Sequence, residues 1–170
     1  MSVLIELRPE SGPVLVVGGG AIALRKARTL VDGGFAVTVV SPVITADLQS
    51  IAARCTEREF EDRDISEQRW ALVLACTDDR DVNQRVGSSA REKGIPVLVA
   101  DAQDESTFFS PAVFRDGALQ VAVSTGGADP SLAKTIRERI VGALGTGWGE
   151  RIAAARRTRQ DRLGRAGDDE

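Results

Sequence analysis

The chain has 170 residues, a formal net charge of −3 and 42% hydrophobic residues, as expected for one globular domain with a small addition. No strong basic charge points to nucleic acid, and no apolar stretch is long enough to span a membrane, so we expect a cytoplasmic protein that binds neither. Histidine and tyrosine are absent, so any acid–base chemistry must fall to Asp, Glu, Lys, Cys or the substrate.

The first part of the chain alternates short apolar runs with amphipathic segments. This alternation predicts a Rossmann-like α/β fold, in which helical crossovers join the strands of a parallel sheet. An edge strand is expected at Leu4–Leu7. The central strands are expected at Pro13–Val17, Phe35–Val40, Glu57–Phe60, Trp70–Cys76 and Ile95–Ala100, with helices at Ala21–Asp32, Thr45–Ala53 and Asp79–Lys93.

Three glycines, Gly18 to Gly20, follow the first central strand and open the first helix. With Ala23 three residues on, they match the G-x-G-x-x-A dinucleotide fingerprint, with a structural turn as the alternative. Gly18 would make the tight turn, and Gly20 would let the backbone approach a pyrophosphate held by the first N–H groups of the helix. The expected cofactor contacts here are Gly18, Gly20, Ala21, Ile22 and Ala23.

The carboxyl ends of the other strands carry further candidates, because ligands of Rossmann-like sheets bind at that edge. Ser41 stands where an acidic residue usually holds the NAD ribose, and no arginine adjoins it to neutralise a 2′-phosphate. We therefore expect NAD rather than NADP. Ser41, Pro42 and Val43 are expected near the adenosine, and Thr77 near the nicotinamide.

After residue 110 the pattern changes. Asp116-Gly117 separates the apolar runs Pro111–Arg115 and Ala118–Ser124, which predicts a β-hairpin. Asp129-Pro130 then starts a helix, and glycines at 145–149 separate an arginine-rich last helix. The expected regions are an NAD-binding domain at 1–110, a hairpin-plus-helix dimerisation and substrate region at 111–147, and a C-terminal helix and tail at 148–170.

The hairpin carries more apolar side chains than one helix can cover, which predicts a homodimer. These side chains are Ala112, Val113, Phe114, Leu119, Val121 and Val123.

Four segments, in order, read VLVVGGGAIALRKARTL, ACTDDRDVNQRV, VADAQDESTFFSPAVF and VAVSTGGADPSLAKTIRERI, and they cover most of residues 13–140. Together they resemble the precorrin-2 dehydrogenase family, the dehydrogenase module of siroheme synthases, some of which are also sirohydrochlorin ferrochelatases. The resemblance implies a homodimer whose NAD⁺-binding domain and hairpin-and-helix region enclose a tetrapyrrole cleft. It also implies oxidation of precorrin-2 to sirohydrochlorin by hydride transfer to the nicotinamide.

The resemblance places the family's key aspartate at Asp101 and its substrate-side turn at Ser124 and Thr125. In a chain without histidine, Asp101 is a reasonable acceptor for the proton that leaves with the hydride, with a capping aspartate as the alternative. Precorrin-2 is a polycarboxylate, and a turn before a helix is a candidate anion nest, with simple helix capping as the alternative. The turn consists of Ser124, Thr125, Gly126 and Gly127.

Two features argue against ferrochelatase activity. Family members continue past the last helix of this chain, and the chain has no histidine ligands, although Asp101 alone could serve. Cys55 and Cys76 lack CxxC spacing, so we expect small buried side chains and no metal site. The main alternative function is a non-enzymatic NAD-sensing module, which usually keeps the acidic residue that Ser41 replaces. A different small reductase of the same fold is the second alternative.

Overall fold

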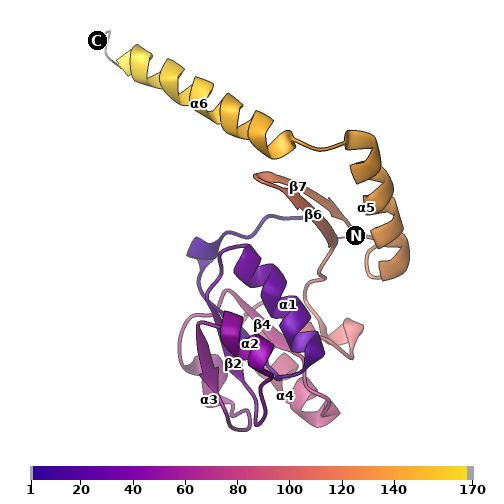
Figure 1. Cartoon of the computed structure of the whole chain (residues 1–170). Helices are drawn as coiled ribbons and strands as arrows, with labels where there is room; N and C mark the ends of the chain where they lie inside the picture. The colour runs from indigo at the N-terminus through magenta and orange to yellow at the C-terminus, as the bar shows by residue number, and fades with distance from the viewer. Residues whose placement is uncertain (1, 168–170) are drawn as a thin grey trace. The chain divides into compact units, whose positions relative to one another are not determined.

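The structure is a computed structural model that describes residues 2–167, with the side chains of the last helix described as far as residue 160. The chain forms two compact units, one from Ser2 to Phe109 and the other from Ser110 onward. Each unit is taken by itself below, and Figure 1 labels their helices and strands.

The first unit is built on a five-stranded parallel sheet in the order β3-β2-β1-β4-β5. The order reverses between β1 and β4, which is the point where ligands of such sheets bind. This arrangement confirms the expected Rossmann-like sheet. The strands are β1 (Val14–Val17), β2 (Val37–Val40), β3 (Arg54–Thr56), β4 (Leu72–Ala75) and β5 (Val97–Val99).

Side chains alternate in direction along each strand, so both faces of this sheet carry apolar residues. Helices cover both faces and bury these residues. Val16 packs with Ala23 on one face, whereas Leu15 packs with Val86 on the other. All four residues of β1 are buried, as expected for the central strand of a parallel sheet. The first face is covered by α1 (Ala21–Asp32) and α2 (Ala46–Ile51), and the second by α3 (Arg63–Ser66) and α4 (Arg80–Glu92).

Two of the strand predictions are wrong. Leu4–Leu7 forms no strand, since the sheet ends at β3 and β5, and the chain instead turns through the 3₁₀ helix η1 (Pro9–Ser11). The third strand lies at Arg54–Thr56 rather than Glu57–Phe60, because the parallel register with β2 aligns Val40 with Thr56. Phe60 is buried in the loop that follows, against the second face of the sheet.

The second unit contains a two-stranded hairpin and two helices. Asp116 pairs with Leu119, so the two-residue turn is Gly117-Ala118 and not the expected Asp116-Gly117. The Asp116 carboxylate accepts a hydrogen bond from Trp148 N (2.9 Å), at the start of the last helix. The elements are β6 (Ala112–Asp116), β7 (Leu119–Val123), α5 (Pro130–Leu144) and α6 (Trp148–Gly167).

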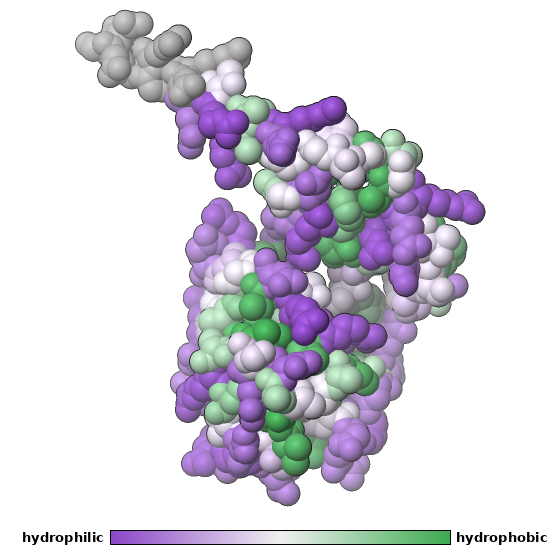
Figure 2. Space-filling model, viewed as in Figure 1, coloured by the Kyte–Doolittle hydropathy of each residue, from purple (hydrophilic) through white to green (hydrophobic). Residues whose placement is uncertain are grey.

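The second unit has little core of its own. Among the side chains described between residues 110 and 160, only Ala133 is buried. Figure 2 shows apolar surface on this unit between its polar side chains. Four residues of α5 at helical spacing stay exposed: Leu132, Ile136, Ile140 and Leu144.

Among the described residues, none of the helices combines the length and the apolar character that a membrane span requires. The expected C-terminal region 148–170 includes residues 168–170, which lie outside the described part of the chain.

Candidate functional site

The turn after β1 is held against β4 at the place where the strand order reverses. Gly18 has φ +118°, a conformation that glycine adopts without strain. A Cβ at Gly18 would lie 2.6 Å from the carbonyl carbon of Cys76, the residue that follows β4. Only glycine therefore fits between the two strand ends, as the fingerprint predicts for the tight turn.

The beginning of α1 is open. Gly20 occupies the N-cap position with φ −92°, no side chain caps the helix, and a Cβ at Gly20 would meet no atom within 4 Å. The first backbone N–H groups of a helix have no intrahelical acceptor and carry partial positive charge. Ala23 is buried against the sheet, while Ala21 and Ile22 are exposed. This open, uncapped helix start fits a pyrophosphate.

The loop after β2 packs against the glycine turn. Thr45 N donates to Gly19 O (3.0 Å), and a Cβ at Gly19 would lie 2.8 Å from Ile44 Cα. The buried Ser41 hydroxyl donates to Val43 O (2.9 Å), so it shapes the loop that Pro42 extends. The Val43 side chain is 77% exposed beside this loop. The structure therefore brings both expected cofactor loops to one edge of the sheet.

Thr77, after β4, is held by a side chain that the sequence did not single out. The fully buried Asn83 amide accepts from Thr77 N (3.0 Å) and from the Thr77 hydroxyl (2.8 Å), and it donates to Thr77 O (3.0 Å). The Thr77 hydroxyl also accepts from Asp79 N (3.2 Å). These bonds fix the end of β4 through the first turn of α4. Contact between Thr77 and a nicotinamide stays a prediction.

Charged groups gather around Cys76 at the same edge. Burial raises the pKa of the Cys76 thiol to about 11, although the positive charges of Lys26 and Arg25 act to lower it, and Asp101 raises it further. Burial also lowers the pKa of the half-buried Lys26 ammonium. Cys76 is therefore a protonated, buried side chain, as expected, and two cations of α1 lie within electrostatic reach of it. Cys55 is only half-buried.

Asp101 follows β5 and is partly exposed, with 38% of its side chain accessible. Its Oδ1 lies 3.9 Å from Nη1 of Arg80, the first residue of α4. The other terminal nitrogen of Arg80 donates to Glu105, at the end of the 3₁₀ helix η2 (Gln103–Glu105). Asp101 is thus a solvent-accessible carboxylate, beside a guanidinium, at the carboxyl edge of the sheet.

The expected substrate turn belongs to the second unit, and its polar groups bond within it. Gly126 and Gly127 adopt positive φ, and Ser124 Oγ accepts from Gly126 N (3.1 Å). Thr125 Oγ1 accepts from Asp129 N (3.1 Å). Asp129 caps α5 by accepting from the N–H groups of Ser131 and Leu132, both at 2.9 Å. The helix start at Asp129 is confirmed, and substrate contact by the turn stays a prediction.

Sequence reasoning did not single out Asn83 or Arg80, or see that Lys26 is half-buried. A signal existed for Arg80, because it directly follows the Asp79 cap at the edge where ligands are expected. The sequence does not distinguish Asn83 from the other polar residues of an amphipathic helix, and only the fold shows that Asn83 is buried. Among the described residues, no group of three or more Cys, Asp or Glu side chains is arranged to hold a metal ion.

Two family models match the chain. The model described as "Putative NAD(P)-binding" matches residues 5–112. The model described as "Sirohaem biosynthesis protein central" matches residues 116–143. The first match covers the Rossmann-like sheet, and the second covers β7 and most of α5, so the resemblance drawn from the four sequence segments is confirmed.

Curated relatives agree. The siroheme synthase of Methylococcus capsulatus is 41% identical over 161 residues, which are 91% of this chain and 34% of the relative. The siroheme synthase of Thioalkalivibrio sulfidiphilus is 40% identical over 154 residues, 88% of this chain and 31% of the relative. The chain thus spans about a third of the length of these relatives.

A solved structure has a similar fold. It is titled "SirC, precorrin-2 dehydrogenase", and it superposes with a TM-score of 0.74 at 28% sequence identity, over 88% of this chain and 74% of that chain. Because the matched families cover both units in sequence, the chain belongs to the putative NAD(P)-binding family and continues into the central region of sirohaem biosynthesis proteins.

Proposed function

We propose that this chain is a dehydrogenase that oxidises precorrin-2 to sirohydrochlorin, with NAD⁺ as the hydride acceptor. The observation that carries the proposal is the match to SirC over 88% of the chain. The open helix start at Gly20 and the Asp101 carboxylate at the same sheet edge support it. An NAD-sensing module would not account for residues 116–143, which match the sirohaem central model.

Each candidate residue has a distinct task in this proposal. The uncapped N–H groups at Gly20, Ala21 and Ile22 bind the pyrophosphate, and the loop at 41–43 lies beside the adenosine. NAD⁺, when bound, supplies a nicotinamide that accepts the hydride. Loss of two hydrogens from the macrocycle also releases a proton, and Asp101 accepts that proton on a carboxylate oxygen.

NAD is favoured over NADP by the same loop. Residues 41–43 carry no arginine or lysine for a 2′-phosphate, and the Ser41 hydroxyl is already bonded to Val43 O. We therefore expect NAD⁺ to bind more tightly than NADP⁺ in a direct titration of the purified protein. Tighter binding of NADP⁺ would refute this preference.

Turnover is tested by anaerobic incubation with precorrin-2 and NAD⁺, following NADH formation and the tetrapyrrole spectrum. If Asp101 accepts the proton, Asp101→Asn lowers kcat by about two to four orders of magnitude and leaves the Kd for NAD⁺ nearly unchanged. Near wild-type turnover by this variant would show that the proton leaves to solvent. No NADH formation by the wild-type chain would refute the function itself.

We also propose that two copies of the chain associate through the second unit. This unit has little core of its own, because its hairpin is only half-buried and α5 exposes an apolar stripe of Leu132, Ile136 and Ile140. The isologous interface of a homodimer would cover both. Analytical ultracentrifugation should give a dimer at tens of micromolar (roughly the range for an obligate interface), and Ile136→Glu should yield monomers with an intact first unit. A wild-type monomer at that concentration would contradict the proposal.

A further inference from the structure

Helix α1 carries three cations within four residues: Arg25, Lys26 and Arg28. None of the ion pairs formed by described residues involves any of the three. Most other arginines of the first unit lie within 4.0 Å of a carboxylate; they are Arg8, Arg54, Arg58, Arg63, Arg80 and Arg85. Within the described part of the chain, the three cations of α1 are therefore not neutralised by a carboxylate at ion-pair distance.

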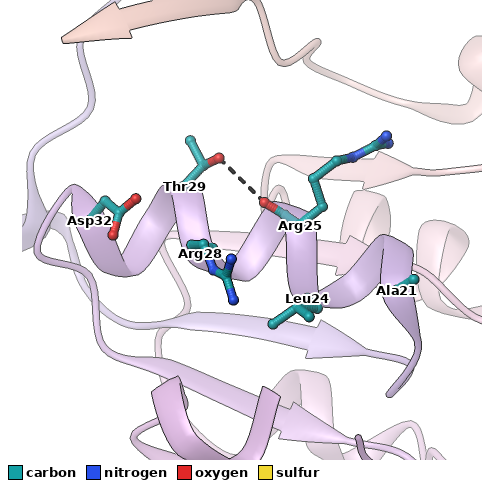
Figure 3. A pocket seen from close by; sticks show the side chains of 6 residues that line it. All are labelled: Ala21, Leu24, Arg25, Arg28, Thr29 and Asp32. Carbon is teal, nitrogen blue, oxygen red and sulfur yellow. Dashed lines mark hydrogen bonds between the residues drawn. The ribbon is translucent and has the colours of Figure 1, made fainter. Parts of the chain in front are cut away.

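Arg25 and Arg28 line a groove of about 340 Å³ on the outer side of α1 (Figure 3). Leu24 and Ala21 give it an apolar wall, and Asp32 lies at its far end, toward the C-terminus of the helix. Figure 3 shows the Arg25 guanidinium extending toward the end of the helix that carries Ala21. The groove is large enough for a short carboxylate side chain and is cationic at the end nearest the glycine turn.

The same cations act on the reaction edge of the sheet. Lys26 and Arg25 both act electrostatically on Cys76, whose carbonyl group lies against Gly18. Asp101 acts on the same thiol from β5. Partial burial of the charged Lys26 ammonium costs desolvation free energy, and a bound anion would offset that cost. Lys26 and Arg25 therefore lie within electrostatic reach of the edge where the reaction is expected.

We propose that Arg25, Lys26 and Arg28 form a subsite for carboxylate side chains of the tetrapyrrole, so that α1 orients the macrocycle toward the reaction edge. This inference rests on the proposed function, because that function makes the substrate a polycarboxylate. The cofactor phosphates are a different anion. They are assigned to the N–H groups at Gly20 to Ile22, which leaves the side chains one turn further along the helix for the substrate.

The test compares the double variant Arg25→Gln/Arg28→Gln with Arg69→Gln. Arg69 is also exposed, but it precedes β4 at the opposite edge of the sheet, so it is a control for loss of one exposed arginine charge away from the groove. The double variant should raise KM for precorrin-2 by about 5- to 30-fold with a nearly unchanged kcat, whereas the control should behave as wild type. The matching Lys substitutions should restore part of the affinity, because they keep the charge.

A binding measurement separates this inference from the proposed function. Uroporphyrin, an inert polycarboxylate, and coproporphyrin, which has half as many carboxylates, are titrated against each protein. The double variant should lose affinity for uroporphyrin more than for coproporphyrin, with an unchanged Kd for NAD⁺. The subsite would be overturned if the double variant had the same uroporphyrin affinity and the same KM as the Arg69→Gln control. A higher Kd of the double variant for NAD⁺ would also overturn it. A wild-type chain that does not turn over would instead refute the proposed function.

Discussion

Substitution of Gly20 by Asp should separate the stability of the protein from cofactor binding. Gly20 is the N-cap of α1 with φ −92°, and an added Cβ meets nothing within 4 Å, so the side chain causes no strain. Asp is a better N-cap than Gly by a few tenths of a kcal/mol, and its charge at a helix start contributes about 0.3–1 kcal/mol more. The variant should therefore be more stable by about 0.5–1 kcal/mol, with a Tm higher by about 1–4 °C.

The same carboxylate occupies the position assigned to the pyrophosphate. Two charges about 4 Å apart repel by about 1 kcal/mol in water and about 4 kcal/mol near a protein surface, which raises Kd by about 5- to 1000-fold. Thermal unfolding without cofactor and a fluorescence titration with NADH measure the two effects. Gly20→Asn, which caps without charge, should keep part of the affinity. Unchanged NADH affinity in a folded Gly20→Asp protein would refute the assignment of the glycine loop.

Three further substitutions test the frame around the site. Gly18→Ala should destabilise the protein by about 2–4 kcal/mol in urea unfolding, because it combines a positive φ with a Cβ 2.6 Å from the Cys76 carbonyl carbon. Asn83→Ala should cost about 2–4 kcal/mol, since it leaves polar groups at Thr77 without their partner; a loss below about 1 kcal/mol would show that water replaces the amide. The third is Asp64→Asn. Burial is the largest single influence on Asp64 and opposes its ionisation. The hydrogen bonds from Arg58 (2.8 Å) and Glu61 N (2.9 Å), together with the charges of Arg58 and Arg63, outweigh burial, so the pKa is lowered. The resulting stability is present above the unfolded pKa of about 3.9 and is lost as pH falls through the folded pKa. This variant should be about 2–3 kcal/mol less stable than wild type at pH 7, and the difference should shrink in urea unfolding at pH 3; a difference that persists there would refute the linkage.

The sheet was predictable from the sequence because its central strands are continuous apolar runs between glycine turns and helix caps. β1 and β4 follow this rule, and their positions were found to within two residues at each end. β3 was misplaced because it is an edge strand with one apolar residue, Cys55, so only its register with β2 locates it. Leu4–Leu7 has strand-like residues, but in the structure it pairs with neither edge strand of the sheet, β3 or β5.

The site was predictable where backbone geometry alone imposes a residue type. Gly18 and the Asp129 cap are of this kind, because a positive φ and an open helix start each select few amino acids. Asn83 and Arg80 were not predicted, since their roles depend on which strand ends come together. The exposure of the α5 stripe also could not be predicted, because helical spacing marks an apolar face without saying what covers it.

A chain without histidine leaves few groups able to take a proton at the reaction edge. Cys76 is excluded as a base at neutral pH by its pKa of about 11. Burial lowers the pKa of the nearby Lys26 ammonium, whose side chain is half-buried. Glu105 is bonded to Arg80, and one of its carboxylate oxygens is buried. Asp101 is more exposed than Glu105, and its distance of 3.9 Å from Arg80 is too long for a direct hydrogen bond. A base must be reachable by the substrate, and Asp101 is the more exposed of the two carboxylates, which is why the proposed function assigns the proton to it.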